Sequence, residues 1–78
     1  MRLGDVELEV GDELNIWIRA RDGTPNRRHP YTGRIVRFGE CQCAEVHPVL
    51  EVVEDTSWGE LVCGDYVINS IRRKIRGP

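Results

Sequence analysis

Long apolar runs are missing from this sequence, and so is a framework of paired cysteines. No stretch approaches the roughly 20 apolar residues that span a bilayer, and the first ten residues, MRLGDVELEV, lack the apolar core of a signal peptide. The chain has three cysteines, an odd count, whereas small secreted domains use even sets as disulfide frameworks. These absences predict a cytoplasmic protein without a membrane partner.

Lysine is almost missing as well. Of the 11 basic residues only Lys74 is not arginine, and arginine favours bidentate contacts with phosphate or carboxylate over simple solubilisation. Hydrophobic residues (40%) and charged residues (31%) occur in the proportions of a folded globular chain. A length of 78 residues suffices for one small core. We therefore expect a single domain over residues 1–78.

The net charge of −2 conceals a segregation of charge along the chain. Residues 19–37 contain six arginines and a single acid, Asp22, whereas residues 38–71 contain seven acids and no basic residue. The last seven residues are basic again. Whether the two basic segments meet in space decides between one basic patch and two separate surfaces, and the sequence leaves both open.

Apolar residues with a period of two predict two strands near the N-terminus. Val6, Leu8 and Val10 indicate a short strand, and after a Gly-Asp turn a second strand places three apolar side chains inward: Leu14, Ile16 and Ile18. The same alternation turns Trp17 outward. Residues 21–33 contain two prolines and two glycines and are expected to form a long loop.

The rest of the chain continues in short strands. In order, we expect a strand at 34–38, a bulge or bend at Gly39, another segment at 41–46, and a strand at 49–53 that Pro48 confines to an edge or to a start after a break. A helical turn near 57–63 should follow, with a capping box of Ser57 and Glu60, and should end at Gly64. The chain should then finish with a strand at 66–71 and a frayed basic tail at 71–78. Such a pattern predicts a mainly β chain folded as a small five- to six-stranded barrel, PUA-like or SH3-like.

Three short motifs occur in a familiar order: VGDEL at 10–14, YTGR at 31–34 and YVINSI at 66–71, with an L-x-x-G element at 61–64. This order resembles the ASCH/PUA-like small barrels, in particular a phage and bacterial branch with the pattern VGDxL…YTGR…GYVVLSI. The resemblance implies a PUA-like barrel that binds RNA or nucleotides. That branch begins with a further helix and strand and a basic GKKTxExR-like segment. Only nine residues precede Val10 here, so no role of that segment is transferred, and an SH3-like barrel with similar turns remains the alternative.

The arginine-rich part of the chain also carries aromatic rings. Single-stranded nucleic acid favours such a surface, because arginine neutralises phosphate while rings stack on bases. In the alternative interpretation this is a solvated loop whose arginines pair with acids of residues 40–65, in exposed pairs that stabilise the fold little. The candidate nucleic-acid-binding residues are Trp17, Arg19, Arg21, Arg27, Arg28, Tyr31 and Arg34.

The cysteines suggest a metal site that we do not favour. Two cysteines at positions i and i+2 of a strand share a face, and a tetrahedral zinc site would then consist of Cys41, Cys43, His47 and Cys63. Zinc sites commonly space such a pair by two to four residues, and free cysteine is often buried as a small hydrophobe. Core cysteines, and therefore no cofactor, are the favoured interpretation.

No catalytic signature is present, and so small a domain offers little room for a ligand pocket. The sequence therefore favours a non-enzymatic binding module for RNA or another nucleic acid. The alternative is a protein-interaction or inhibitor module, such as a phage-type accessory protein, that uses its acidic face or the rings of Trp17 and Trp58. Trp58 is expected instead to cover an open end of the barrel. An exposed edge strand near Pro48 leaves a homodimer open.

Overall fold

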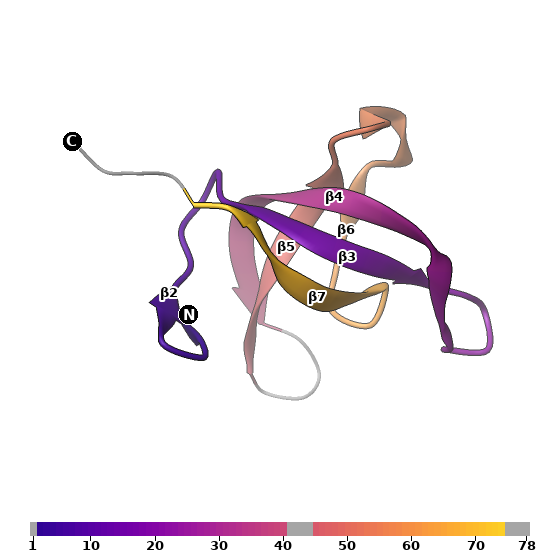
Figure 1. Ribbon diagram of the computed structural model, residues 1–78, viewed down its shortest axis with the longest axis horizontal. Helices are drawn as coiled ribbons and strands as arrows, with labels where there is room; N and C mark the ends of the chain where they lie inside the picture. The colour runs from indigo at the N-terminus through magenta and orange to yellow at the C-terminus, as the bar shows by residue number, and fades with distance from the viewer. Residues whose placement is uncertain (1, 41–44, 75–78) are drawn as a thin grey trace.

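The computed structural model describes residues 2–40 and 45–74, and these are mainly β-strand (Figure 1). Strand accounts for 64% of the structure, and the described residues contain no helix apart from one 3-10 turn, η1 (Thr56–Trp58). The prediction of a mainly β chain is therefore confirmed. The strands are β1 (Arg2–Leu3), β2 (Val6–Glu7), β3 (Glu13–Arg19), β4 (Pro25–Glu40), β5 (Val46–Val52), β6 (Glu60–Leu61) and β7 (Tyr66–Arg73).

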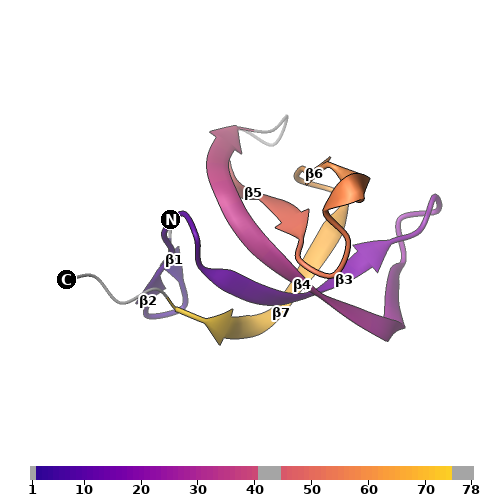
Figure 2. The same ribbon diagram turned by 90° about the horizontal axis from the view of Figure 1, so that it is seen from above.

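The strands form a two-stranded sheet, β1–β2, and a five-stranded antiparallel sheet in the order β6-β5-β4-β3-β7. The long strand β4 bends and pairs with β3 on one side and β5 on the other (Figure 2). The prediction of a closed barrel is wrong, because β6 and β7, the two edge strands of the sheet, do not pair with each other. A two-residue β6 offers too few backbone groups to pair along the eight residues of β7.

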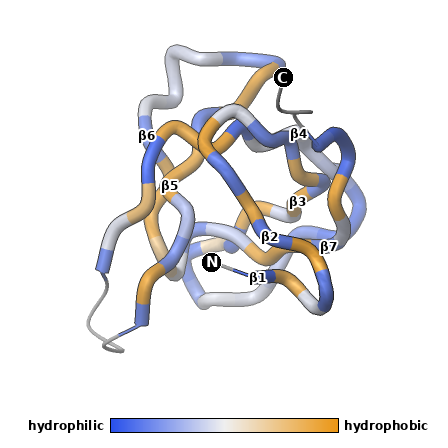
Figure 3. The backbone as a smooth tube through the Cα atoms, turned by 90° about the vertical axis from the view of Figure 1, so that its left-hand side faces the viewer, coloured by the Kyte–Doolittle hydropathy of each residue, from blue (hydrophilic) through white to orange (hydrophobic). Residues whose placement is uncertain are grey.

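A small aliphatic core lies on the inner face of this sheet. Leu14 and Ile16 of β3 are fully buried, and Ile18 is half-buried against them, so the predicted inward set is confirmed. The alternation of hydrophobic and hydrophilic residues along the strands is visible in Figure 3. The other buried members of the cluster are Leu8, Ile35, Leu50 and Tyr66.

The expected strand over residues 6–10 is wrong beyond Glu7. Leu8 is buried, but Val10 is 55% exposed and lies in a turn. The Asp12 N–H donates to the Glu9 carbonyl at 3.1 Å, and the Asp12 carboxylate accepts the Glu9 N–H at 2.8 Å. These two bonds close a turn that the period-two pattern of apolar residues does not reveal.

The expected long loop at 21–33 is also wrong, because β4 already begins at Pro25. Proline lacks an N–H and is tolerated where one side of a strand has no partner. The β5 ladder reaches β4 only from Gly33 onward, and β3 pairs with Pro25, Pro30 and Tyr31 but skips residues 26–29 at a register shift. The β3–β4 connection is short, and Gly23 adopts a φ of 88° within it.

The helical turn is shorter than predicted and has a different cap. Asp55 takes the cap position, and its carboxylate accepts the Ser57 N–H at 3.1 Å. Glu60 lies in β6 and so does not complete a capping box. Gly64 has the expected positive φ, 97°, but it belongs to the turn that leads into β7.

Gly39 and Pro48 both lie inside strands. The irregularity in β4 falls between Ile35 and Arg37 rather than at Gly39, which pairs with His47. Pro48 is placed within β5 opposite Phe38, where the β6 side of the strand is unpaired because β6 reaches only Leu50 and the residue after it. Of the segment expected at 41–46, residues 41–44 lie outside the described residues, and Val46 begins β5.

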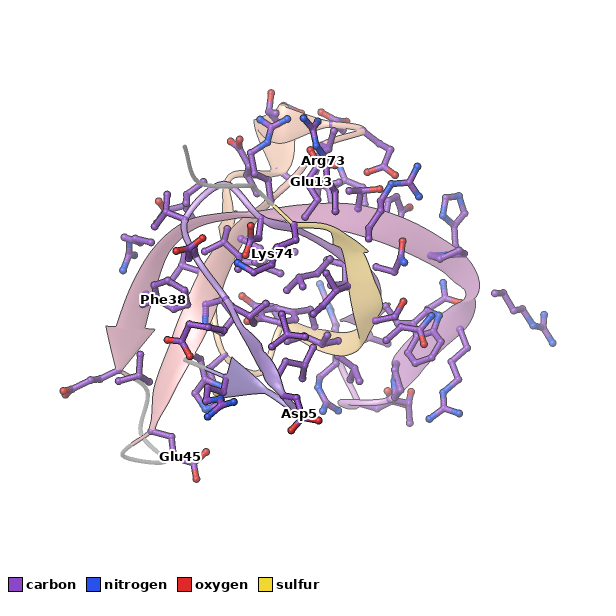
Figure 4. All side chains as sticks on the ribbon, turned by 60° about the vertical axis from the view of Figure 1, so that its left-hand side comes forward. Asp5, Glu13, Phe38, Glu45, Arg73 and Lys74 are labelled. Atoms are coloured by element: carbon purple, nitrogen blue, oxygen red, sulfur yellow. The ribbon has the colours of Figure 1, made fainter. Side chains whose placement is uncertain are left out.

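The last strand extends beyond its expected end at residue 71, into the segment predicted to be a frayed tail. β7 continues to Arg73, and the Lys74 ammonium donates to Glu9 and Asp12 at 3.1 Å each. Arg73 and Lys74 lie at the same end of the molecule as Glu13 (Figure 4). Residues 75–78 lie outside the described part of the chain.

Candidate nucleic-acid interface

The end of β3, the beginning of β4 and the connection between them form an extension of the sheet that we call the hairpin tip (residues 19–31). It lies at the opposite end of the molecule from β2 and from the end of β7 (Figure 1). Four of the seven candidate residues are arginines of this tip: Arg19, Arg21, Arg27 and Arg28. The antiparallel pairing of β3 with β4, from Glu13–Arg34 to Arg19–Pro25, brings them together.

Arg27 covers the ring of Trp17. The carbon at the centre of its guanidinium group lies 5.1 Å from the ring centroid, which is cation–π distance. Trp17 pairs with Pro30 and Val67, and its neighbour Ile16 points into the core. Trp17 therefore lies on the outer face of the sheet beside a guanidinium group, which confirms the predicted orientation of the indole.

The arginines of the tip form no ion pair with any acid of the described chain. The Arg19 guanidinium donates to the Gly23 carbonyl at 2.6 Å. Asp22, the single acid of the tip, accepts the Thr24 hydroxyl at 2.6 Å and the Thr24 N–H at 3.0 Å. These bonds, the hydroxyl bond first, hold the pKa of Asp22 below its ordinary value. The tip therefore carries four arginines against one carboxylate, and that carboxylate is bonded to Thr24 rather than to an arginine.

Arg34 is held in a different environment from the tip arginines. Its guanidinium lies 3.0 Å from Glu51 and 3.7 Å from Glu13. These residues belong to a charge row that the strand register places side by side across β7, β3, β4, β5 and β6: Arg73, Glu13, Arg34, Glu51 and Glu60. Arg37 adds an ion pair to Glu60 at 2.9 Å. The alternative interpretation of the arginines, pairing with later acids, is therefore confirmed for Arg34 and Arg37.

Tyr31 lies on the other face of the hairpin from Trp17. It pairs with Ile16, and directly opposed residues of two strands share a face. Its ring stacks on His29 with centroids 4.5 Å apart and meets Trp58 edge-on at 4.9 Å. The predicted binding set is thus split over two faces. His29 was missed by the sequence analysis, although its spacing of two residues from Tyr31 predicts a shared face.

The second basic segment does not join the tip. Arg73 pairs with Glu13 at the start of β3, six residues before Arg19, and this separation corresponds to roughly 20 Å along a strand. Partial burial would lower the pKa of Lys74, but hydrogen bonds to Asp12 and Glu9 outweigh it and hold that pKa above its ordinary value. The two basic segments therefore form separate surfaces, and Lys74 is already paired with Glu9 and Asp12.

A hollow of about 520 Å³ lies between β5 and β7, where the sheet stays open. The expectation of little room for a ligand pocket is therefore wrong for the volume of this hollow, although the hollow is open rather than enclosed. The hydroxyl of Tyr66 crosses this opening to donate to the Pro48 carbonyl. Burial, followed by the nearby Cys63 and Asp65, raises the pKa of Tyr66 to about 12. The hollow is lined by Arg19, His47, Cys63, Gly64, Tyr66 and Ile68.

Only part of the suggested zinc set can be located. His47 and Cys63 line the same hollow, whereas Cys41 and Cys43 lie outside the described residues. Within residues 2–40 and 45–74, no three His, Cys, Asp or Glu side chains are grouped so that they would hold a metal ion.

Two further findings bear on what the chain is. No helix in the described ranges is long and apolar enough to cross a membrane. Comparisons with protein-family models, with curated proteins and with solved structures found no match, so its function is inferred from the geometry above.

Proposed function

We propose that this protein is a non-enzymatic module that binds single-stranded nucleic acid through the hairpin tip. One observation carries the proposal: Arg27 lies over the outward Trp17, and the three further arginines of the same hairpin tip have no acid partner among the described residues. A surface of this kind combines charge for phosphates with a ring for bases.

The physical basis is the difference between a paired and an unpaired guanidinium. An arginine already bonded to a carboxylate must give up that bond before it binds phosphate, whereas a solvated one exchanges only water and counterions. The tip arginines have no carboxylate bond to give up among the described residues, although Arg19 donates to the Gly23 carbonyl and Arg27 lies over Trp17. The acidic net charge does not oppose this, because local potential rather than net charge steers a polyanion to a surface.

A second proposal concerns the fold and is more specific than a mainly β architecture. We propose that the open sheet is a variant of a PUA-like or SH3-like barrel, in keeping with the motif order VGDEL, YTGR and YVINSI. It is supported by β4, whose 16 residues bend and are shared between two ladders. Small barrels turn their corners with strands of this kind.

A protein-binding role for the acidic segment is the competing proposal, and it has less support. Glu51 and Glu60 are occupied by Arg34 and Arg37, so a basic partner would first have to displace these arginines. A binding partner of this kind would be a protein, and its binding would not depend on the tip.

The test is fluorescence anisotropy with labelled single-stranded RNA and DNA at about 50 mM salt and up to about 10 µM protein, which lies within the range of non-specific dissociation constants at physiological salt. We expect wild-type protein to bind and Arg27→Glu/Arg28→Glu to lose binding. Arg2→Glu/Arg72→Glu is the matched control, because it reverses the same number of charges away from the tip and should bind more strongly than the tip variant. If wild-type protein binds no oligonucleotide under these conditions, the proposal is wrong.

A further inference from the structure

We propose that Trp58 forms a second base-binding station on the inner face of the hairpin, across the edge of β4 from Trp17. The inference rests on the function proposed above and names a contact that this function does not include. The station consists of Trp58, Tyr31 and His29, three rings that η1 and β4 bring into one cluster.

The indole of Trp58 is available for stacking. It retains 46% exposure, which makes it one of the most exposed large apolar side chains described. Its contact with Tyr31 is edge-on, at an interplanar angle of 61°. Tyr31 can cover at most one of the two faces of that indole, and its own ring is already stacked on His29 at 21°. At least one face of Trp58 therefore remains free of Tyr31.

The position of the station fits a single-stranded nucleic acid that lies along β4. Over residues 25–31 the only partner strand of β4 in the described sheet is β3, which it meets at Pro25, Pro30 and Tyr31, so its other edge is open. Trp17 and Arg27 lie on the outer face of this segment, while Tyr31 and Trp58 lie on the inner face. A single-stranded nucleic acid that follows this open edge would have arginines without acid partners along its phosphate backbone and an aromatic ring on each face of the hairpin.

The chemistry selects an unpaired base on a polyanion. Stacking needs an exposed base face, which a duplex does not offer, and it is tolerant of base identity. The adjacent arginines lack acid partners within the described chain, so the surface complements a phosphate backbone rather than a neutral or basic peptide. RNA and DNA share this chemistry, and the test includes both.

The experiment measures binding of labelled oligo-U and oligo-dT of about 12 nucleotides, within the site sizes of single-strand binding folds, to four proteins. These are wild type, Trp58→Ala, Trp58→Phe and Val62→Ala. Val62 has the same 46% exposure but no ring, so its variant controls for the loss of exposed apolar surface. Circular dichroism verifies that each variant is folded.

We expect Trp58→Ala to weaken binding by about 5- to 150-fold, the loss typical of one base–aromatic stack. The salt dependence should stay unchanged, because no charge is removed. Trp58→Phe should retain most of the affinity and Val62→Ala all of it. If Trp58→Ala binds like Val62→Ala while Arg27→Glu/Arg28→Glu abolishes binding, the station is wrong and the proposed function stands. If wild-type protein binds neither oligonucleotide, both are wrong.

Discussion

The hairpin tip and the charge row both contain arginine, but the arginines have different partners in the two regions. In the charge row Arg34 is paired in register with Glu13 and Glu51, and the three side chains form ion pairs. In the tip, Arg27 meets an indole, and the single acid is bonded to Thr24. Cross-strand register thus decides which arginines stabilise the sheet and which are left to bind a ligand.

A second difference between these regions is burial. The strands that carry the charge row also enclose the aliphatic core on their inner face, whereas residues 26–30 of the tip are all exposed. Substitutions in the body of the sheet should therefore change stability, and those in the tip should change binding. The predictions below test this separation.

The largest expected effect comes from two neighbours on β3. Ile16 is fully buried, and Ile16→Ala should lower the free energy of unfolding by about 2–5 kcal/mol because it leaves a cavity. Trp17→Ala, on the outer face, should cost less than about 2 kcal/mol while it weakens nucleic-acid binding. Urea titration followed by circular dichroism measures the first effect and anisotropy the second. A larger loss of stability in Trp17→Ala than in Ile16→Ala would contradict the separation.

A smaller effect is expected from Tyr66 at alkaline pH. Its pKa is raised to about 12 from an ordinary value of 10.0, so the folded state retains a proton that the unfolded state releases. The resulting stability is complete below pH 10 and is lost as the pH rises toward 12, by on the order of 2 kcal/mol.

The matched control for this effect is Tyr66→Phe, which cannot titrate and also lacks the bond to the Pro48 carbonyl. It should be less stable than wild type at neutral pH and should lose less stability between pH 10 and 12. Arginine stays charged throughout this range, so the tip should bind until the sheet unfolds. An equal alkaline loss in both proteins would show that Tyr66 is not the titrating group.

The sequence was most informative where local pattern and environment agree. Alternation over 14–18 predicted both the core side chains and the outward indole, because a short strand with one buried face leaves few choices. The last strand was found for the same reason, although it continues to Arg73.

Long-range register explains most of what was missed. Whether Tyr31 shares a face with Trp17 depends on the register of β3 against β4, and only the pairing reveals that Tyr31 lies opposite Ile16. Pro25 and Pro30 indicate a loop by composition, but an unpaired edge tolerates both. Closure of a barrel likewise depends on the length of β6, where two residues pair and the pattern shows no strand. The same holds for Lys74, whose acid partners lie more than 60 residues away in the sequence.

The most direct test compares one unpaired arginine with one paired arginine through the salt dependence of binding. With four arginines on single-stranded nucleic acid, the slope of log affinity against log salt concentration should be roughly −3. Arg28→Gln should reduce its magnitude by somewhat less than one, and Arg34→Gln should leave it unchanged. If Arg34→Gln reduces the slope as much as Arg28→Gln does, or if wild-type affinity does not depend on salt, the unpaired arginines of the tip are not the phosphate contacts.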